Sequence, residues 1–197
     1  LRETEEMEKR MVRSAAREIS YTAMVVAIIA VCAWIAIPLP SNISITLQTM
    51  GVCLAAGFLG WKRGLIAVAV YILLGLCGVP VFQGFTAGAA KLGSVTGGYI
   101  VGFLFTAAAV GLAADYIKVK SGWLRAAALV AAMVVGVALC YLFGTIWFID
   151  VYNAGADTTV TFAAALMTCV VPYILPDLVK IVCAAALVTK LKKYMKL

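Results

Sequence analysis

Residues 124–146 read LRAAALVAAMVVGVALCYLFGTI, and the only charged side chain in this stretch is Arg125, close to its start. A helix needs roughly 20 mostly apolar residues to cross the hydrocarbon core of a bilayer, so the stretch predicts a membrane-spanning helix. The whole chain is similar, because 64% of its 197 residues are hydrophobic and 13% are charged. Soluble domains average about 45–50% apolar and about 25% charged residues. We therefore expect an all-α integral membrane protein with little soluble mass.

The distribution of basic residues predicts the number of crossings. Apolar segments also occupy 19–37, 46–60, 64–79, 97–114 and 166–189, which makes six expected transmembrane helices. Alternate connections hold 14 of the 16 Lys and Arg residues: 1–18, WKRG at 61–64, DYIKVKSGWLR at 115–125, and the C-terminal KLKKYMKL. Since an excess of Lys and Arg marks cytoplasmic loops, both termini are predicted to be cytoplasmic. The expected parts are a cytoplasmic segment 1–18, a membrane domain 19–190 and a basic cytoplasmic tail 191–197.

The connections on the other side of the membrane are longer and carry little basic charge. They are PLPSNISI at 38–45, PVFQGFTAGAAKLGSVT at 80–96, and residues 147–165. Long connections in a compact fold are often lids or binding loops. This asymmetry predicts that the protein captures something from the external side.

Two charges inside the last apolar segment are the first candidate site. The stretch PYILPDLVK at 172–180 contains Asp177 and Lys180, three residues apart and therefore on one face of a helix. A lone charge at the bilayer centre costs at least about 2.5–3.5 kcal/mol, and intramembrane ionisable groups often face a cavity and act on a ligand or ion. The alternative is a buried ion pair that ties the last helix to its neighbours, and the sequence leaves both interpretations open.

Other polar and aromatic residues are expected at the same outer level. Gln48 opens the second apolar segment beside Thr46, and its amide both donates and accepts hydrogen bonds; the alternative is a polar helix start facing the lipid headgroups. The 80–99 region adds further candidates: Phe82, Phe85, Lys91 and Tyr99. In the first segment, Ala23 and Ala27 form a small-xxx-small pair that suits close helix packing, either inside the bundle or against a partner.

Several function classes have little support. The basic residues form no stripe interleaved with aromatics, so nucleic-acid binding is not expected. The chain has no histidine and its six cysteines are scattered, which leaves few ligands for a metal site. The stretch GFTAGAAKLG at 84–93 does not fit the phosphate-binding loop of an ATPase, and no serine or cysteine sits in a nucleophile motif. We therefore expect a chain without catalysis, metal or cofactor of its own.

Three stretches together resemble the BioY family, the biotin-specific S components of energy-coupling-factor (ECF) vitamin transporters. They are SITLQTMGVCLAAGFLGWKRGLIAVAVYILLGLCGVPVF, LGSVTGGYIVGF and PYILPDLVK, and the likeness runs over about residues 20–190. The resemblance implies a six-helix S-component fold in a bacterial or archaeal cell membrane and high-affinity capture of biotin from outside. It also implies a transmembrane coupling protein and two cytoplasmic ATPases as partners, which would use the ATP.

The resemblance also implies roles for individual residues. Asp177, Lys180 and Gln48 match positions that look like biotin contacts, with Tyr99 and the preceding loop as a cover, and Ala23 and Ala27 lie on the implied docking face for the coupling protein. Residues 82–91 depart from the glycine-rich run that the family often shows there, so Lys91 is a candidate mainly as the other external cation. Alternatives are an S component for another vitamin, a membrane enzyme that uses Asp177, or an ion-coupled permease that uses the Asp177/Lys180 pair.

Overall fold

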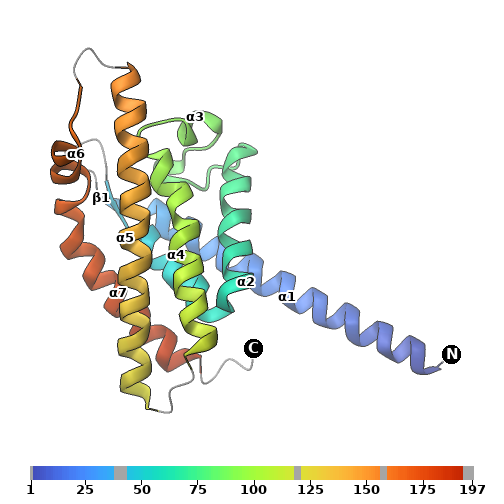
Figure 1. The fold of residues 1–197 in the computed structure, drawn as a ribbon. Helices are drawn as coiled ribbons and strands as arrows, with labels where there is room; N and C mark the ends of the chain where they lie inside the picture. The colour runs from blue at the N-terminus through green and yellow to red at the C-terminus, as the bar shows by residue number, and fades with distance from the viewer. Residues whose placement is uncertain (1, 38–43, 118–120, 156–158, 193–197) are drawn as a thin grey trace.

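The computed structural model describes residues 2–37, 44–117, 121–155 and 159–192, and most of them are helical (Figure 1). Five helices in this part of the chain are long and apolar enough to cross a membrane: α1 (Arg2–Trp34), α2 (Gln48–Leu76), α4 (Gly97–Tyr116), α5 (Gly122–Gly155) and α7 (Val171–Leu191). The shorter elements are β1 (Ala36–Ile37), β2 (Ile45–Thr46), η1 (Gln83–Phe85), α3 (Ala89–Leu92) and α6 (Phe162–Cys169). Strands β1 and β2 pair antiparallel. Most of the 38–45 turn, Lys118, Lys120 and the tail from 193 lie outside the described residues.

The second and third predicted spans are two arms of α2, joined at Gly60. Gly60 has φ 79° and ψ −175°, a region of backbone conformation that is essentially restricted to glycine. The chain turns back on itself there, because a Cβ added to Gly64 would lie 2.7 Å from the Cα of Ala56. Asp115 occupies the space beside Gly60, and its Oδ2 accepts a hydrogen bond of 2.9 Å from the Trp61 amide. With both arms counted, the helices agree with the predicted six-helix S-component fold.

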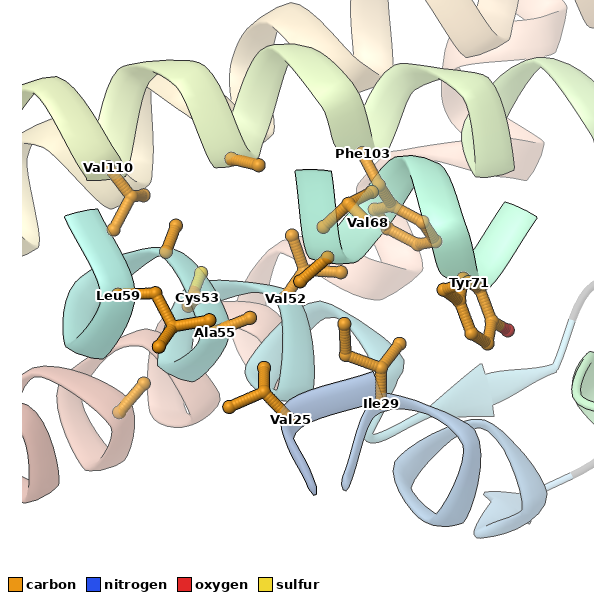
Figure 2. Packing of buried hydrophobic residues seen from close by; sticks show 14 of the residues in the cluster. Val25, Ile29, Val52, Cys53, Ala55, Leu59, Val68, Tyr71, Phe103 and Val110 are labelled. Atoms are coloured by element: carbon orange, nitrogen blue, oxygen red, sulfur yellow. The ribbon is translucent and has the colours of Figure 1, made fainter. Parts of the chain in front are cut away.

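The helices pack through small residues as well as through apolar ones. Figure 2 shows Val25 and Ile29 of α1, Val52 and Val68 from the two arms of α2, and Phe103 of α4 in one buried cluster. Elsewhere, α4 and α5 approach closely where a Cβ on Gly136 would lie 2.9 Å from the Cα of Thr106. The Thr106 hydroxyl donates a 3.0 Å hydrogen bond to the Gly136 carbonyl. Small residues and interhelical hydrogen bonds of this kind hold membrane helices together, since lipid supplies no hydrophobic drive between them.

The predicted helix boundaries need three corrections. Segment 1–18 and the first span form the single helix α1, which ends at Trp34 and not at residue 37. Helix α5 continues to Gly155, so much of the expected loop 147–165 is helical. The last segment is broken at Val170, which separates α6 from α7. Pro172 stands at the start of α7, where its fixed φ suits a first helical turn.

The two ends of the bundle differ in construction. We call the end with the Gly60–Gly64 turn the turn end; there the Lys192 ammonium donates a 3.1 Å hydrogen bond to the Gly57 carbonyl. We call the opposite end the loop end, because it carries residues 79–96 and α6. In Figure 1, α3 and α6 lie near the top of the molecule, and the last part of α7 lies near the bottom. The irregular backbone, which offers groups to a ligand, is therefore concentrated at the loop end.

Candidate functional site

A cavity at the loop end lies among α2, α4, α5 and α7. The space between its side chains is about 730 Å³, a figure that includes open solvent at its mouth. The lining combines hydroxyl, amide and charged groups with apolar side chains: Ser44, Thr46, Gln48, Thr49, Gln83, Lys91, Thr96, Tyr99, Ile100, Phe103, Val137, Cys140, Tyr141, Cys169, Tyr173, Asp177 and Lys180. Six of the eight predicted ligand contacts are therefore brought together around one cavity.

Asp177, Lys180 and Tyr141 form a hydrogen-bonded cluster in the wall of this cavity. The Lys180 ammonium lies 2.6 Å from Oδ1 of Asp177, and the Tyr141 hydroxyl donates to Oδ2 over 2.5 Å. Asp177 and Lys180 are only 5% and 7% exposed. Charge-assisted hydrogen bonds to both carboxylate oxygens offset part of the cost of burying the pair. The cluster thus presents an ammonium, a carboxylate and a phenol to the cavity in fixed positions.

The sequence of α7 places these charges at cavity level. Helix α7 starts after the break at Val170, so its first turns lie at the loop end. Pro176 is inside the helix, and a proline there removes one backbone hydrogen bond and disturbs the preceding turn. Asp177 and Lys180 follow at spacing i, i+3, which puts both on the face that meets α5 and the cavity.

Gln48, at the start of α2, is held by two neighbours. Its side-chain Nε2 donates a 2.7 Å hydrogen bond to the hydroxyl of Tyr71 in the second arm of the same helix. Its backbone amide donates to the Thr46 hydroxyl over 3.3 Å. The side chain is 5% exposed and lines the cavity. Gln48 is therefore a buried residue of the cavity wall, which disfavours the alternative of an exposed polar helix start.

The segment 91–96 closes part of the cavity and is tied to α5. The Trp147 indole donates a 3.1 Å hydrogen bond to the Ser94 carbonyl, and the Tyr99 hydroxyl lies 3.2 Å from that of Thr145. Lys91 is half-buried, and this burial lowers the pKa of its ammonium from the usual value near 10.5. In the part of the chain that the structure describes, Lys91 forms no ion pair. It is thus a cation in the cavity lining that is available to a ligand anion.

Two predicted ligand contacts, Phe82 and Phe85, do not line the cavity. Phe82 is fully buried and meets the Tyr71 ring edge-on, with ring centroids 5.5 Å apart. Phe85 is 63% exposed and stacks on Trp34 of α1 at 4.8 Å. Their position in a loop near the site suggested contact with a ligand, but each ring packs against another aromatic side chain. Both residues shape the loop end and lie outside the cavity.

The predicted docking residues line a different groove. Ala23 and Ala27 face an apolar groove between α1 and the second arm of α2, whose other walls include Trp34, Leu74 and Pro80. The Trp34 indole donates to the Pro80 carbonyl over 3.0 Å, which fixes the upper end of the groove. Since this groove lies outside the cavity lining, a partner seated there would not touch a ligand bound in the cavity.

Sequence reasoning missed several lining residues, and Tyr141 is the main one. It lies within the long apolar run of α5, where a tyrosine looks like a packing residue. The available signal was its polar tip, since a buried tyrosine hydroxyl usually finds a partner. Tyr173, Cys140 and Cys169 gave even less signal, because tyrosine and cysteine are ordinary components of apolar helices.

The lining as a whole suits a small polar molecule with an apolar body. It offers hydrogen-bond donors and acceptors, the ammonium of Lys91 in α3, and apolar walls from α4 and α5. Among the described residues, no three His, Cys, Asp or Glu side chains are grouped as metal ligands. The lining residues themselves can recognise a ligand by hydrogen bonds and charge.

Comparison with known proteins gives a consistent result. The sequence model of the BioY family matches residues 5–197. The biotin transporter BioY of Thermotoga maritima is 37% identical over 177 residues, which are 90% of this chain and 96% of that protein. A probable biotin transporter BioY of Pyrococcus horikoshii is 31% identical over 90% of this chain and 97% of its own length. A crystal structure of the S-component for biotin from an ECF-type ABC transporter has a TM-score of 0.78 and 27% identity, with 92% of this chain and 93% of that one covered.

The mutual dependence of Asp177 and Lys180 can be measured without any ligand. Lys180→Met leaves a buried carboxylate without its cation and should lower the free energy of unfolding by roughly 3 kcal/mol. In the double variant Asp177→Asn/Lys180→Met the uncompensated charge is gone, so most of that loss should be recovered. Thermal unfolding of the purified protein in detergent measures both. Arg63→Met, which breaks the exposed pair with Glu18, is the control and should cost no more than about 1 kcal/mol. Additive losses in the double variant would show that the two charges do not stabilise each other.

Proposed function

The chain belongs to the BioY family, and on that premise we propose that it is the subunit that captures biotin for an ECF-type vitamin transporter. It is a multi-pass protein of the cell membrane and a transport protein, not an enzyme. The observation that carries the proposal is the Tyr141–Asp177–Lys180 cluster, buried at membrane depth yet lining a cavity among the helices. A purely structural ion pair would have no need to face such a cavity.

The functional groups of biotin match those of the lining. The ureido ring of biotin carries two N–H donors and one carbonyl acceptor, and its valerate chain ends in a carboxylate. Asp177 and Gln48 can accept from ureido N–H groups, and Lys180 can donate to the ureido carbonyl. Ile100, Phe103 and Val137 supply apolar walls for the thiophane ring and the chain.

The balance of charges in the cavity lining favours one orientation of biotin. Lys180 is already neutralised by Asp177 at 2.6 Å, so a ligand carboxylate placed beside it would add an uncompensated negative charge at a buried position. Lys91 is half-buried and has no acidic partner among the described residues. We therefore place the ureido ring at the Asp177–Lys180 cluster and the carboxylate at Lys91.

The cavity should open on the external side of the membrane. The turn end carries Lys62, Arg63, Arg125 and Lys192, and an excess of Lys and Arg marks the cytoplasmic side. The loop end has Lys91 as its basic residue between 80 and 96. Biotin would therefore enter from outside, and both chain termini would be cytoplasmic.

Release of biotin inside requires partners, which we propose to be a transmembrane coupling protein and two cytoplasmic ATPases. The apolar groove with Ala23 and Ala27 is the proposed docking surface for the coupling protein, because small residues let a helix approach closely. ATP would be used by the ATPases, and we expect this chain to need no cofactor of its own.

Equilibrium binding of labelled biotin to the purified chain tests the central proposal. Asp177→Asn and Lys180→Met should each weaken binding at least tenfold, because each leaves a buried charge or a ligand group without its partner. Asp150→Asn and Lys190→Met make the same chemical changes at exposed positions and should leave affinity unchanged. Absence of binding by the unmodified chain at micromolar biotin would exclude the proposal, and binding of another vitamin in its place would reassign the ligand.

A neutral analogue tests the orientation. Replacing the biotin carboxylate by a carboxamide should weaken binding about tenfold in the unmodified protein, because an ion pair with Lys91 is lost. In Lys91→Met, biotin and its amide should bind with similar affinity. Since burial lowers the pKa of Lys91, the preference for biotin should be full below that lowered pKa and disappear as the pH rises through it. A preference that survives in Lys91→Met would place the carboxylate elsewhere.

The docking surface can be separated from the cavity by one substitution. Ala27→Trp would fill the groove of Ala23 and Ala27, so it should abolish co-purification with the coupling protein and leave biotin affinity unchanged. Ala131→Trp, at an exposed position on α5 outside both this groove and the cavity, is the control for a bulky residue elsewhere in the bundle. Loss of biotin binding in Ala27→Trp would indicate that this face packs inside the fold.

A further inference from the structure

Tyr71 lies behind the cavity wall and links two parts of the site. It belongs to the second arm of α2, is fully buried, and is not among the residues that line the cavity. Its hydroxyl accepts from Nε2 of Gln48 over 2.7 Å and donates to the Val81 carbonyl over 3.0 Å. In Figure 2, the Tyr71 hydroxyl points away from the other labelled side chains of the buried cluster.

The direction of these hydrogen bonds follows from the groups themselves. A phenol has a single O–H donor, and the Val81 carbonyl can only accept. Because Val81 is buried, leaving its carbonyl without the Tyr71 proton would cost the desolvation of that group. The Tyr71 oxygen can then only accept from Gln48, so the NH₂ group of the amide must face Tyr71. The amide oxygen, which is bonded to the same carbon as this NH₂ group, then points away from the Tyr71 hydroxyl.

The surroundings prevent Tyr71 from turning elsewhere. Phe82 packs edge-on against its ring, and Phe82 in turn fills the space beside Gly75, where a Cβ would lie 2.0 Å from the Phe82 ring. The Gly88 amide donates to the Gly75 carbonyl over 2.7 Å, which attaches the same loop to α2. The loop 81–88 and the second arm of α2 therefore hold the Tyr71 hydroxyl in one place.

We propose that Tyr71 is a positioning residue that fixes the orientation of the Gln48 amide, so that Gln48 offers its carbonyl oxygen to the ligand. The cavity then selects an N–H donor at this position. The identity of that ligand as biotin, with its ureido N–H groups, rests on the proposed function, whereas the orientation of the amide does not.

A set of four proteins tests the route from Tyr71 through Gln48. Tyr71→Phe keeps the ring that packs on Phe82 and removes only the hydroxyl, so biotin should bind about tenfold more weakly as the amide loses its fixed orientation. Gln48→Met removes the acceptor and should also weaken binding. In Gln48→Met/Tyr71→Phe the second change should add nothing, because there is no amide left to orient. An equal loss from Tyr71→Phe in both backgrounds, or no loss at all, would contradict the proposal.

A second measurement needs no ligand. The sequence contains two glutamines, Gln48 and Gln83, so selective ¹⁵N labelling gives two side-chain NH₂ signals, and Gln48→Met identifies which belongs to Gln48. Tyr71→Phe should shift the Gln48 signal and leave that of Gln83 in place. An unchanged Gln48 signal would show that Tyr71 does not hold the amide.

The two measurements separate this inference from the proposed function. If the unmodified chain does not bind biotin and the Gln48 signal shifts, the proposed ligand is wrong and the positioning role stands. If biotin binds and the Gln48 signal does not respond to Tyr71→Phe, the proposed function stands and the positioning role is rejected.

Discussion

The burial of Asp177 beside Lys180 is the constraint around which the loop end of this protein is organised. Two opposite charges at membrane depth remain only if each is paired and hydrogen-bonded, since isolated charges there are costly. The pair meets this requirement within α7, and Tyr141 adds a donor from α5. The need to satisfy one carboxylate thus joins two helices and fixes three polar groups at the wall of a cavity. The contacts that stabilise the buried charges are therefore the same ones that we propose for ligand recognition.

A similar arrangement recurs at the other polar residues of the site. Gln48 is held by Tyr71, and Tyr99 lies within hydrogen-bond distance of Thr145. In each case the cavity residue is oriented by a side chain from another part of the bundle. Such a site loses little conformational entropy when a ligand binds, because its polar side chains are already ordered. Preorganisation of this kind would favour binding of biotin, the ligand proposed above.

Much of the fold was predictable because membrane insertion leaves a clear pattern in a sequence. Long apolar segments and the alternation of basic connections gave the helix count, and charges inside apolar stretches identified Asp177 and Lys180. The position of a residue in a loop near the site does not determine where its side chain points. The sequence therefore predicts Phe82 and Phe85 as ligand contacts, although their rings pack on Tyr71 and Trp34. Tyr141 and Tyr71 were missed because one hydroxyl on a large apolar ring carries little signal in a hydrophobic helix.

At the turn end, charged side chains bind backbone groups of the turn and do not line a ligand cavity. There, charged side chains satisfy the backbone of the turn itself: Asp115 accepts from the Trp61 amide and Lys192 donates to the Gly57 carbonyl. These charged groups are occupied by backbone hydrogen bonds and are not offered to a ligand. They stabilise a tight reversal of the chain at Gly60, whose φ and ψ are essentially restricted to glycine. The polar cavity described above lies at the loop end, so entry of the proposed ligand would begin there. Delivery of the proposed ligand from the loop end to the opposite side would then need movement of the protein as a whole or of its helices, and we propose that the partner subunits drive this movement.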